Sequence, residues 1–335
     1  MVDPIESEVR NLVALHRQGN HVARVGRKAF RESVLPGSVA AVARRDPVSV
    51  LPRYRPGRVD KLLQELAAAA RAGYRDIYAA LAGELAAIGV TQARWAGTIL
   101  RSSVEGIDAT IGVPVTRGSA LAILREGAID GLTLREWLDR AERAYVQASK
   151  REIRRVVDSG GTSDQVRRAV TGRAAMTARR HLNVISRTAT TYIANTAKSV
   201  VYEANSDVLS GIEFVATLDS RTTIICARWD GKVWPVDSPR IQRPPLHVGC
   251  RSALAPVVDW EGLGLEAPKR GTRASEEGQT NAATYDRWFR RQSNAKQNSI
   301  VGPTRARLYR DGKITFRDMV TRDNRVVPVG ELNQR

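Results

Sequence analysis

The sequence predicts an α+β protein, with a predominantly α-helical N-terminal two-thirds and a small α+β module on the C-terminal side. Apolar residues recur at three- and four-residue steps over long stretches, which is the period of one helix face. Aromatic residues make up only 5% of the chain, which favours cores of Ala, Leu, Val and Ile. Turn and proline signals gather in residues 218–254, which also hold both cysteines.

Residues 1–57 are expected to form an extended N-terminal arm. A short helix is predicted at Pro4–Arg17, because the apolar residues of that stretch share one face. Prolines punctuate the rest of the arm and predict extended backbone: Pro36, Pro47, Pro52 and Pro56. Such an arm would dock on a partner subunit or form a poorly ordered terminus.

Residues 58–205 are predicted to form a helical domain. Its clearest helix is Arg58–Ile88, which has a long apolar stripe and Gly89 as a stop signal. Thr133 and Glu136 have the spacing of a capping box, so a helix should begin there. The other expected helices are Gln92–Ser103, Ser119–Gly127, a short helix that ends before Gly172, and Met176–Asn205.

Residues 206–260 are predicted to form the small α+β module. A strand is expected at Phe214–Leu218, and Asp230-Gly231 should form the corner between two strands. The prolines of Arg243-Pro244-Pro245 predict an extended step.

Two further segments complete the chain. Residues 261–284 are polar and small, which is typical of a linker or surface loop. Residues 285–335 are expected to form a tail with a helix at Tyr285–Gln292, followed by a turn at Gly302-Pro303.

The charge of the chain points to a polyanionic neighbour. Lys and Arg number 53 against 35 for Asp and Glu, so the formal net charge is +18 and the pI is near 10.7. No apolar run of the length of a membrane span occurs, and the N-terminal residues lack the apolar core of a signal peptide. Two cysteines in 335 residues argue against a secreted disulfide scaffold, so synthesis in a reducing cytoplasm is expected.

Positive charge is concentrated between Lys150 and Lys198, a segment that contains eleven basic residues and only three acidic ones. Arginine binds phosphate bidentately, and aromatic residues are sparse here, so sequence-independent backbone contact is favoured over base stacking. A solvated helix face with intrahelical pairs is the alternative. The predicted contacts with double-stranded DNA are Arg151, Arg154, Arg155, Arg167, Arg168, Arg179 and Arg180.

Cys226, His247 and Cys250 are the candidate metal ligands. Asp219 or Asp230 could add an oxygen ligand, whereas a structural zinc site prefers four Cys or His ligands. A Cys226–Cys250 disulfide and plain core packing of two buried thiols are the alternatives. No cofactor is expected apart from this possible structural zinc.

Catalytic motifs are absent from the sequence. It contains no Walker loop, no G-x-S-x-G and no H-E-x-x-H. Cys250 and His247 are three residues apart on an expected turn, and Asp219 with Asp230 lacks a third carboxylate for Mg²⁺. No enzymatic activity is therefore predicted. The alternative hypotheses are an enzyme, either a nuclease or a toxin-like effector, and a free cellular DNA-binding protein.

Five short elements in residues 219–251 occur in a recognisable order: Asp-Ser-Arg-Thr, Cys, Asp-Gly-Lys-Val, Pro-Pro-Leu-His and Cys-Arg. In this order they resemble the phage head morphogenesis family, the minor head proteins related to the F protein of phage Mu. The resemblance extends more weakly over Gly118–Leu332. Thr223 and Ser252 stand where the family usually has two further cysteines.

The resemblance implies a minor head protein of a tailed phage, made in the host cytoplasm and located inside the head. Its implied partners are the portal protein, the major capsid or scaffolding protein, and packaged DNA, with no membrane. The motif residues are expected to maintain the fold of the module: Asp219, Arg221, Asp230, Gly231, Pro245, His247, Cys250 and Arg251.

Overall fold

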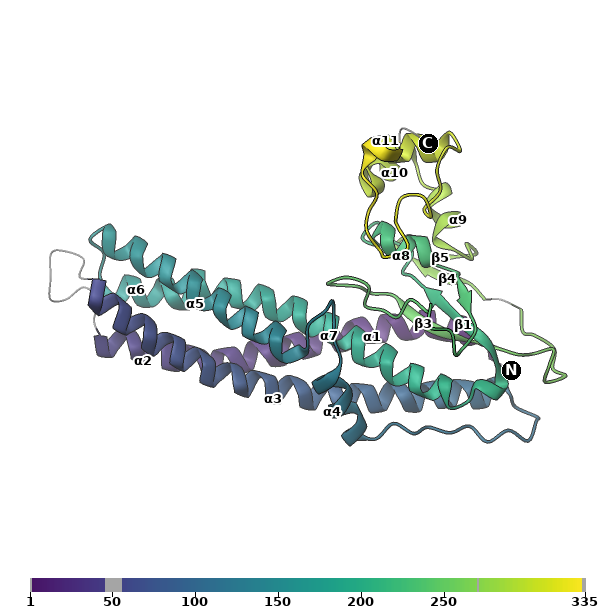
Figure 1. Ribbon diagram of the computed structural model, residues 1–335, viewed down its shortest axis with the longest axis horizontal. Coiled ribbons are helices and arrows are strands. Elements are labelled where there is room, and N and C mark those ends of the chain that lie inside the picture. Colours follow the sequence, from purple (N-terminus) through teal and green to yellow (C-terminus); the bar gives the residue numbers. More distant parts are fainter. Residues whose placement is uncertain (1, 46–55, 270, 333–335) are drawn as a thin grey trace. The chain divides into compact units, whose positions relative to one another are not determined.

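A computed structural model describes residues 2–45, 56–269 and 271–332 (Figure 1). Helices account for 62% of the residues and strands for 8%, and the strands that form the larger sheet lie C-terminal to the long helices. The predicted α+β class is therefore confirmed. The chain divides into two compact units. Unit 1 holds Met1–Arg17, Ile88–Arg117 and Thr191–Arg335, and unit 2 holds Gln18–Ala87 and Gly118–Thr190.

The boundaries between the units fall inside three long helices, α1 (Pro4–Ala29), α3 (Pro56–Ser103) and α7 (Ala175–Glu203). Unit 2 also contains two π-helical turns, η1 (Phe30–Val34) and η2 (Val170–Ala174). Its remaining helices are α2 (Leu35–Arg45), α4 (Arg117–Glu126, which starts at the unit boundary), α5 (Leu134–Asp158) and α6 (Ser163–Ala169).

The helix expected at Pro4–Arg17 is present as the first part of α1, but the extended stretch predicted after it is wrong, because residues 18–45 are helical too. In a regular helix Pro36 would remove one backbone donor and clash with the preceding turn. The π-helical turn η1 comes directly before it, and the Leu35 N–H bonds to the carbonyl five residues back, at Phe30. This wider turn accommodates the proline without ending the helix. Pro47 and Pro52 lie outside the described residues, and Pro56 begins α3.

Two glycines that were expected to end helices do not. Gly89 lies inside α3, which joins the two helices predicted on either side of it. A helical glycine costs about 1 kcal/mol relative to alanine, and the apolar stripe continues beyond it at Ala93, Ala96 and Leu100. Gly172 lies in η2, which joins α6 to α7. The capping box is present as predicted, with Thr133 and Glu136 at the start of α5.

An aromatic cluster marks the core of unit 2. The ring of Phe30 lies edge-on to Tyr145 at 5.2 Å and to Tyr74 at 6.3 Å, and all three side chains are buried. The Tyr145 hydroxyl donates to Ser38 Oγ at 3.0 Å, which gives this buried polar group a partner. The core therefore joins η1, α2, α3 and α5.

A three-stranded antiparallel sheet organises unit 1. Its strand order is β2 (Val233–Trp234), β1 (Leu209–Val215) and β3 (Ala253–Val258), preceded by a 3-10 turn, η3 (Ser206–Val208). One apolar core packs the ends of α3 and α7 with this sheet, and a smaller one packs Val9 and Leu12 of α1 against Val215. In Figure 1 the strands β1 and β3 lie side by side, as their pairing requires.

The module differs from its prediction in three details. The strand expected at Phe214–Leu218 is β1, which ends at Val215. A short helix, α8 (Ile224–Trp229), precedes the Asp230-Gly231 corner where a strand was expected, because Thr223 caps its first turn. The chain bends at Pro244 and the Pro244–Pro245 peptide bond is cis, so the predicted extended step is wrong.

The segment expected to be a linker contains a hairpin, β4 (Arg273–Ser275) and β5 (Gly278–Thr280). Beyond it lie α9 (Tyr285–Arg290), α10 (Asn294–Val301), α11 (Pro303–Arg310) and α12 (Val329–Leu332), as a helical tail. Tyr285, Phe289 and Phe316 form the centre of its aromatic core. The predicted helix and the Gly302-Pro303 turn are both present.

Among the helices of the described residues, none combines the length and the apolar character needed to cross a bilayer.

Candidate functional site

A salt bridge between two motif residues, Asp219 and Arg251, stabilises the module. Arg251 donates to both carboxylate oxygens of Asp219, at 2.5 and 2.6 Å, and Thr222 Oγ1 lies 3.1 Å from Asp219 Oδ1. Burial by itself would raise the pKa of Asp219, but the hydrogen bonds and charge of Arg251 lower it below its usual value. Arg221 is exposed and only reaches this carboxylate at 3.5 Å. Asp219 and Arg251 thus join the loop after β1 to the start of β3.

A second ion pair is more deeply buried. Asp230 Oδ2 accepts from Arg273 Nη1 at 2.8 Å, and the side chains are 0% and 5% exposed. The same carboxylate accepts the backbone N–H groups of Ala216 at 2.6 Å and Tyr285 at 2.5 Å. Asp230 therefore connects β1, the β4–β5 hairpin and the helical tail. Gly231 beside it has φ +76°, a left-handed conformation that suits glycine at this corner.

Asp219 and Asp230, the two aspartates considered as metal ligands from the sequence, are both occupied by these ion pairs. Each carboxylate is bound by a different arginine, so they form no shared Mg²⁺ site, and neither belongs to the sulfur cluster described next. The sequence did not indicate that Arg273 is the ion-pair partner of Asp230. Arg273 lies in a polar, glycine-containing stretch, and no local pattern distinguishes it from the solvated arginines.

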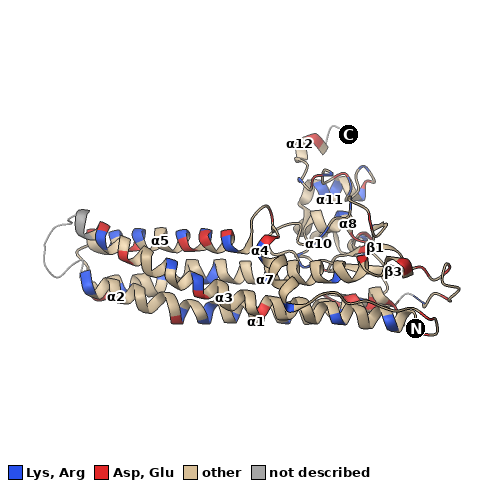
Figure 2. Cartoon of the chain, turned by 60° about the horizontal axis from the view of Figure 1, so that its bottom comes forward, with Lys and Arg blue, Asp and Glu red and all other residues tan. Residues whose placement is uncertain are grey.

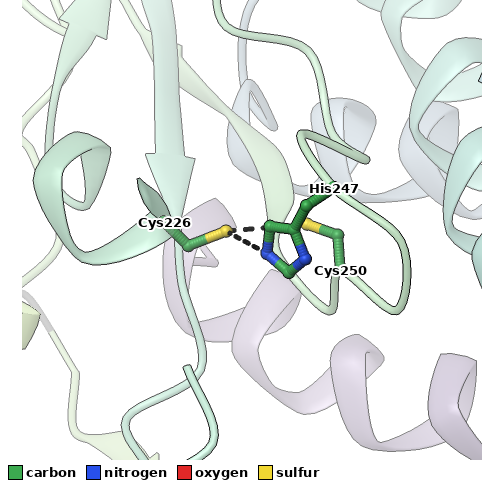
Figure 3. Close-up of side chains that lie close together, drawn as sticks. All are labelled: Cys226, His247 and Cys250. Atoms are coloured by element: carbon green, nitrogen blue, oxygen red, sulfur yellow. Dashed lines mark hydrogen bonds between the residues drawn. The ribbon is translucent and has the colours of Figure 1, made fainter. Parts of the chain in front are cut away.

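Cys226, His247 and Cys250 are brought together, and we name them the thiol–imidazole cluster (Figure 3). Their ligand atoms all lie within 4.8 Å of one another. Cys226 Sγ is 3.2 Å from His247 Nε2 and 3.6 Å from Cys250 Sγ, so the two thiols are free. Both cysteines are 2% exposed. Within the described residues, this is the group of Cys, His, Asp and Glu side chains arranged closely enough to hold a metal ion.

Two hydroxyls border the cluster. Thr223 Oγ1 lies 3.0 Å from His247 Nε2, and the hydroxyls of Thr223 and Ser252 both interact with the Cys226 sulfur. Hydrogen bonding to Cys226, opposed by burial, lowers the pKa of Cys250 well below its usual value, and His247 lowers it further. The bond to Cys250, followed by burial, raises the pKa of Cys226 well above its usual value. The cluster is therefore arranged to hold one thiolate beside an imidazole.

The seven arginines predicted to contact DNA are all exposed, on α5, α6 and α7 of unit 2. Two of them form intrahelical pairs, Arg155 with Glu152 at 2.9 Å and Arg167 with Asp164 at 3.0 Å. Figure 2 shows basic residues recurring along α5 with acidic residues between them. Within the described part of the chain, the five without an ion pair are Arg151, Arg154, Arg168, Arg179 and Arg180. Intrahelical pairing thus accounts for two of the seven arginines.

Lys198 does not belong to this basic surface, although the sequence places it there. Its Nζ lies 2.5 Å from Glu8 Oε1, and both side chains are fully buried in unit 1. Burial lowers the pKa of Lys198 and raises that of Glu8, and each partner opposes the shift of the other. This pair joins α1 to α7 and is structural.

A second cationic surface lies in unit 1, in a cleft of about 1230 Å³ between α8, β2 and the helical tail. Burial, followed by repulsion from Arg317 and Arg322, lowers the pKa of Arg228 at its edge. Any test of DNA contact must distinguish this cleft from the helical surface. The cations that line it are Arg228, Lys232, Arg240, Arg290, Arg317 and Arg322.

Comparison with known proteins gives one family. The family described as phage Mu protein F like protein matches residues 147–255. The matched segment contains the seven arginines, both aspartates and the thiol–imidazole cluster. It therefore confirms the resemblance seen in the motifs of residues 219–251. No curated protein and no solved structure matches the chain.

Proposed function

Since residues 147–255 are a phage Mu protein F-like region of a phage head protein, we propose that the chain is a minor head protein of a tailed phage. In this proposal it resides inside the head, associates with the portal, and contacts packaged double-stranded DNA without sequence preference. The observation that carries the DNA contact is the exposure of all seven arginines within the matched segment.

The chemistry of these arginines supports phosphate contact. Five of them have exposed guanidinium groups without an acidic partner among the described residues, so binding a phosphate breaks no existing ion pair. The chain also carries a net charge of +18, which attracts DNA over distances up to the Debye length. Binding of this kind depends steeply on salt and weakly on base sequence.

The first test replaces Arg151, Arg154, Arg168 and Arg180 with Ser in the full chain. Each lost phosphate contact reduces the slope of log K against log salt by about 0.9, so we expect a reduction of up to about 3.6 for duplex DNA. Fluorescence anisotropy at four salt concentrations measures this slope.

The matched control replaces four exposed cations of the cleft, Lys232, Arg240, Arg317 and Arg322, and so removes the same charge. We expect this variant to keep most of the wild-type slope. If the slope of log K against log salt falls in the control and stays at the wild-type value in the helical variant, DNA binds the cleft. The assignment to α5, α6 and α7 is then wrong.

Portal association rests on the family alone and has its own test. Co-expression of the chain with the portal protein of the same phage should give a complex that co-elutes in size-exclusion chromatography. Separate elution at micromolar concentrations of both proteins would contradict it. The major capsid protein and the scaffolding protein serve as parallel candidates in the same assay.

We assign no catalytic step to this function. The two carboxylates that could have held Mg²⁺ for a nuclease are bound by Arg251 and Arg273, which supports a structural role for both. Incubation of supercoiled DNA with the protein and Mg²⁺ or Mn²⁺ tests the enzymatic rival. Cleavage that copurifies with the chain and stops when the divalent ion is chelated would favour a nuclease.

A further inference from the structure

We propose that Cys226, His247 and Cys250 bind one zinc ion through three protein ligands, with the fourth coordination position facing the hydroxyls of Thr223 and Ser252. The site goes beyond the proposed head function and does not depend on it. The geometry of the cluster, the orientation of the imidazole and the anchoring of the two thiols support it.

The distances within the cluster fit ligands of one tetrahedral ion. With Zn–S bonds near 2.3 Å and Zn–N bonds near 2.0–2.1 Å, neighbouring ligand atoms lie roughly 3.5–3.8 Å apart. The two sulfurs are 3.6 Å apart, which is within this range, and Cys226 Sγ lies 3.2 Å from His247 Nε2, which is about 0.3 Å below it. The sulfurs are thus too far apart for a bond between them and close enough to share an ion.

The imidazole is oriented as a metal-binding histidine requires. His247 Nδ1 lies 3.0 Å from the Val248 carbonyl, which can only accept, so Nδ1 carries the proton. Nε2 then presents its lone pair toward Cys226. A hydrogen bond from the distal ring nitrogen to a backbone carbonyl is the common outer-shell arrangement of zinc-bound histidines.

Each ligand is anchored by the surrounding module. Cys226 lies in α8, whose first turn is capped by Thr223. The Cys250 carbonyl accepts from Thr191 Oγ1 of α7 at 2.9 Å, and the adjacent Arg251 is held by Asp219. Three ligands, one from a helix and two from the loop between β2 and β3, are therefore positioned before any ion binds, which lowers the entropy lost on binding.

The charge of the site also suits a divalent ion. Two thiolates and a neutral imidazole would neutralise Zn²⁺ completely, so the buried complex carries no net charge. Thr223 and Ser252 offer neutral hydroxyls, which are weak zinc ligands compared with thiolate or imidazole. A water molecule held by these hydroxyls would complete the shell. The affinity should therefore lie below that of a four-ligand structural site.

The test uses the full chain, reduced and freed of metal by a chelator, and titrates Co²⁺ as a spectroscopic probe and Zn²⁺ in competition. We expect one equivalent per chain, with thiolate-to-cobalt charge-transfer absorption, and a rise in the thermal midpoint with Zn²⁺. Cys226→Ser, Cys250→Ser and His247→Gln should each lower the affinity on the order of 100-fold. His181→Gln, which alters an exposed histidine outside the cluster, should leave it unchanged.

A gain-of-ligand variant keeps the proposal testable if a ligand variant fails to fold. Ser252→Cys places a thiol beside Cys226 and should raise the zinc affinity at least about tenfold, because it replaces a weak hydroxyl with a thiolate. Two outcomes overturn the proposal. One is no metal uptake with two titratable thiols on unfolding, which means a packed core. The other is the absence of both thiols without reductant, which means a disulfide.

Discussion

Burial decides how much each motif aspartate contributes to the free energy of unfolding. Asp219 and Asp230 are both paired with an arginine, and the sequence pattern treats them alike. Arg251 is 20% exposed and can reach water if its partner is lost, whereas Arg273 is 5% exposed and cannot. Removing one partner of a buried pair leaves an uncompensated charge, and that penalty exceeds the value of the pair itself.

We therefore expect Asp230→Asn to lower the free energy of unfolding by about 3–5 kcal/mol and Asp219→Asn by about 1.5–3 kcal/mol. Urea denaturation followed by circular dichroism measures both. Because the pKa of Asp219 is lowered, its stabilisation is present at neutral pH and is lost as pH falls through the folded value. The difference in the free energy of unfolding between wild type and Asp219→Asn should thus disappear at acid pH. Equal losses at pH 7 for the two variants would refute the burial argument.

The residues of the site were predictable to different degrees. Cys226, His247 and Cys250 are uncommon residue types close together in sequence, so the pattern singled them out before the fold was known. Arg273 and Glu8 complete buried pairs with Asp230 and Lys198 across 43 and 190 residues. Long-range partners of this kind depend on tertiary packing, which no local pattern encodes.

At the scale of elements, the sequence predicted the capped start of α5 correctly, but the helix breaks expected at single glycines and prolines are wrong. Thr133 and Glu136 mark a start through side-chain chemistry that is local and strong. Pro36, Gly89 and Gly172 all suggest ends, yet the chain remains helical at each. The cost of a helical glycine is about 1 kcal/mol, which packing of an apolar stripe easily exceeds. The π-helical turns lack a sequence signal that would predict them.

The backbone of η1 lies very close to α3 at Gly73. A Cβ added at Gly73 would lie 2.8 Å from the Ser33 backbone carbonyl atoms and 2.6 Å from the Val34 side chain. Backbone cannot shift as a side-chain tip does, so Gly73→Ala should destabilise the chain by about 1–3 kcal/mol despite the better helix propensity of alanine.

Gly172→Ala is the matched control for this prediction, because no heavy atom lies within 4 Å of the added Cβ and the residue is also helical. It should be neutral or stabilising by up to about 1 kcal/mol. Thermal and urea unfolding of the two variants measure the difference. A stable Gly73→Ala variant would mean that η1 and α3 separate easily, and the π-helical turn would lose its role in close packing.

For the whole molecule, the excess of positive charge is the dominant property. Ion pairs cannot neutralise 53 basic residues when only 35 acidic ones are present. Like charges in a compact chain repel one another, and in water this repulsion extends over about 30 Å at 0.01 M salt but only about 8 Å at 0.15 M. A polyanion that binds the chain removes the same repulsion by neutralising it.

We accordingly expect the thermal midpoint to rise as sodium chloride increases from 0.01 to 0.15 M, and to rise at constant low salt when short duplex DNA is added. Sodium sulfate at equal ionic strength separates screening from anion binding, because bound sulfate would add stability beyond that of chloride. Differential scanning fluorimetry measures all three series. The quadruple variant of Arg151, Arg154, Arg168 and Arg180 should show a smaller response to both salt and DNA, since it carries less charge to screen. A midpoint that falls with chloride would show that favourable surface ion pairs outweigh the repulsion, and the charge would then matter for binding rather than for stability.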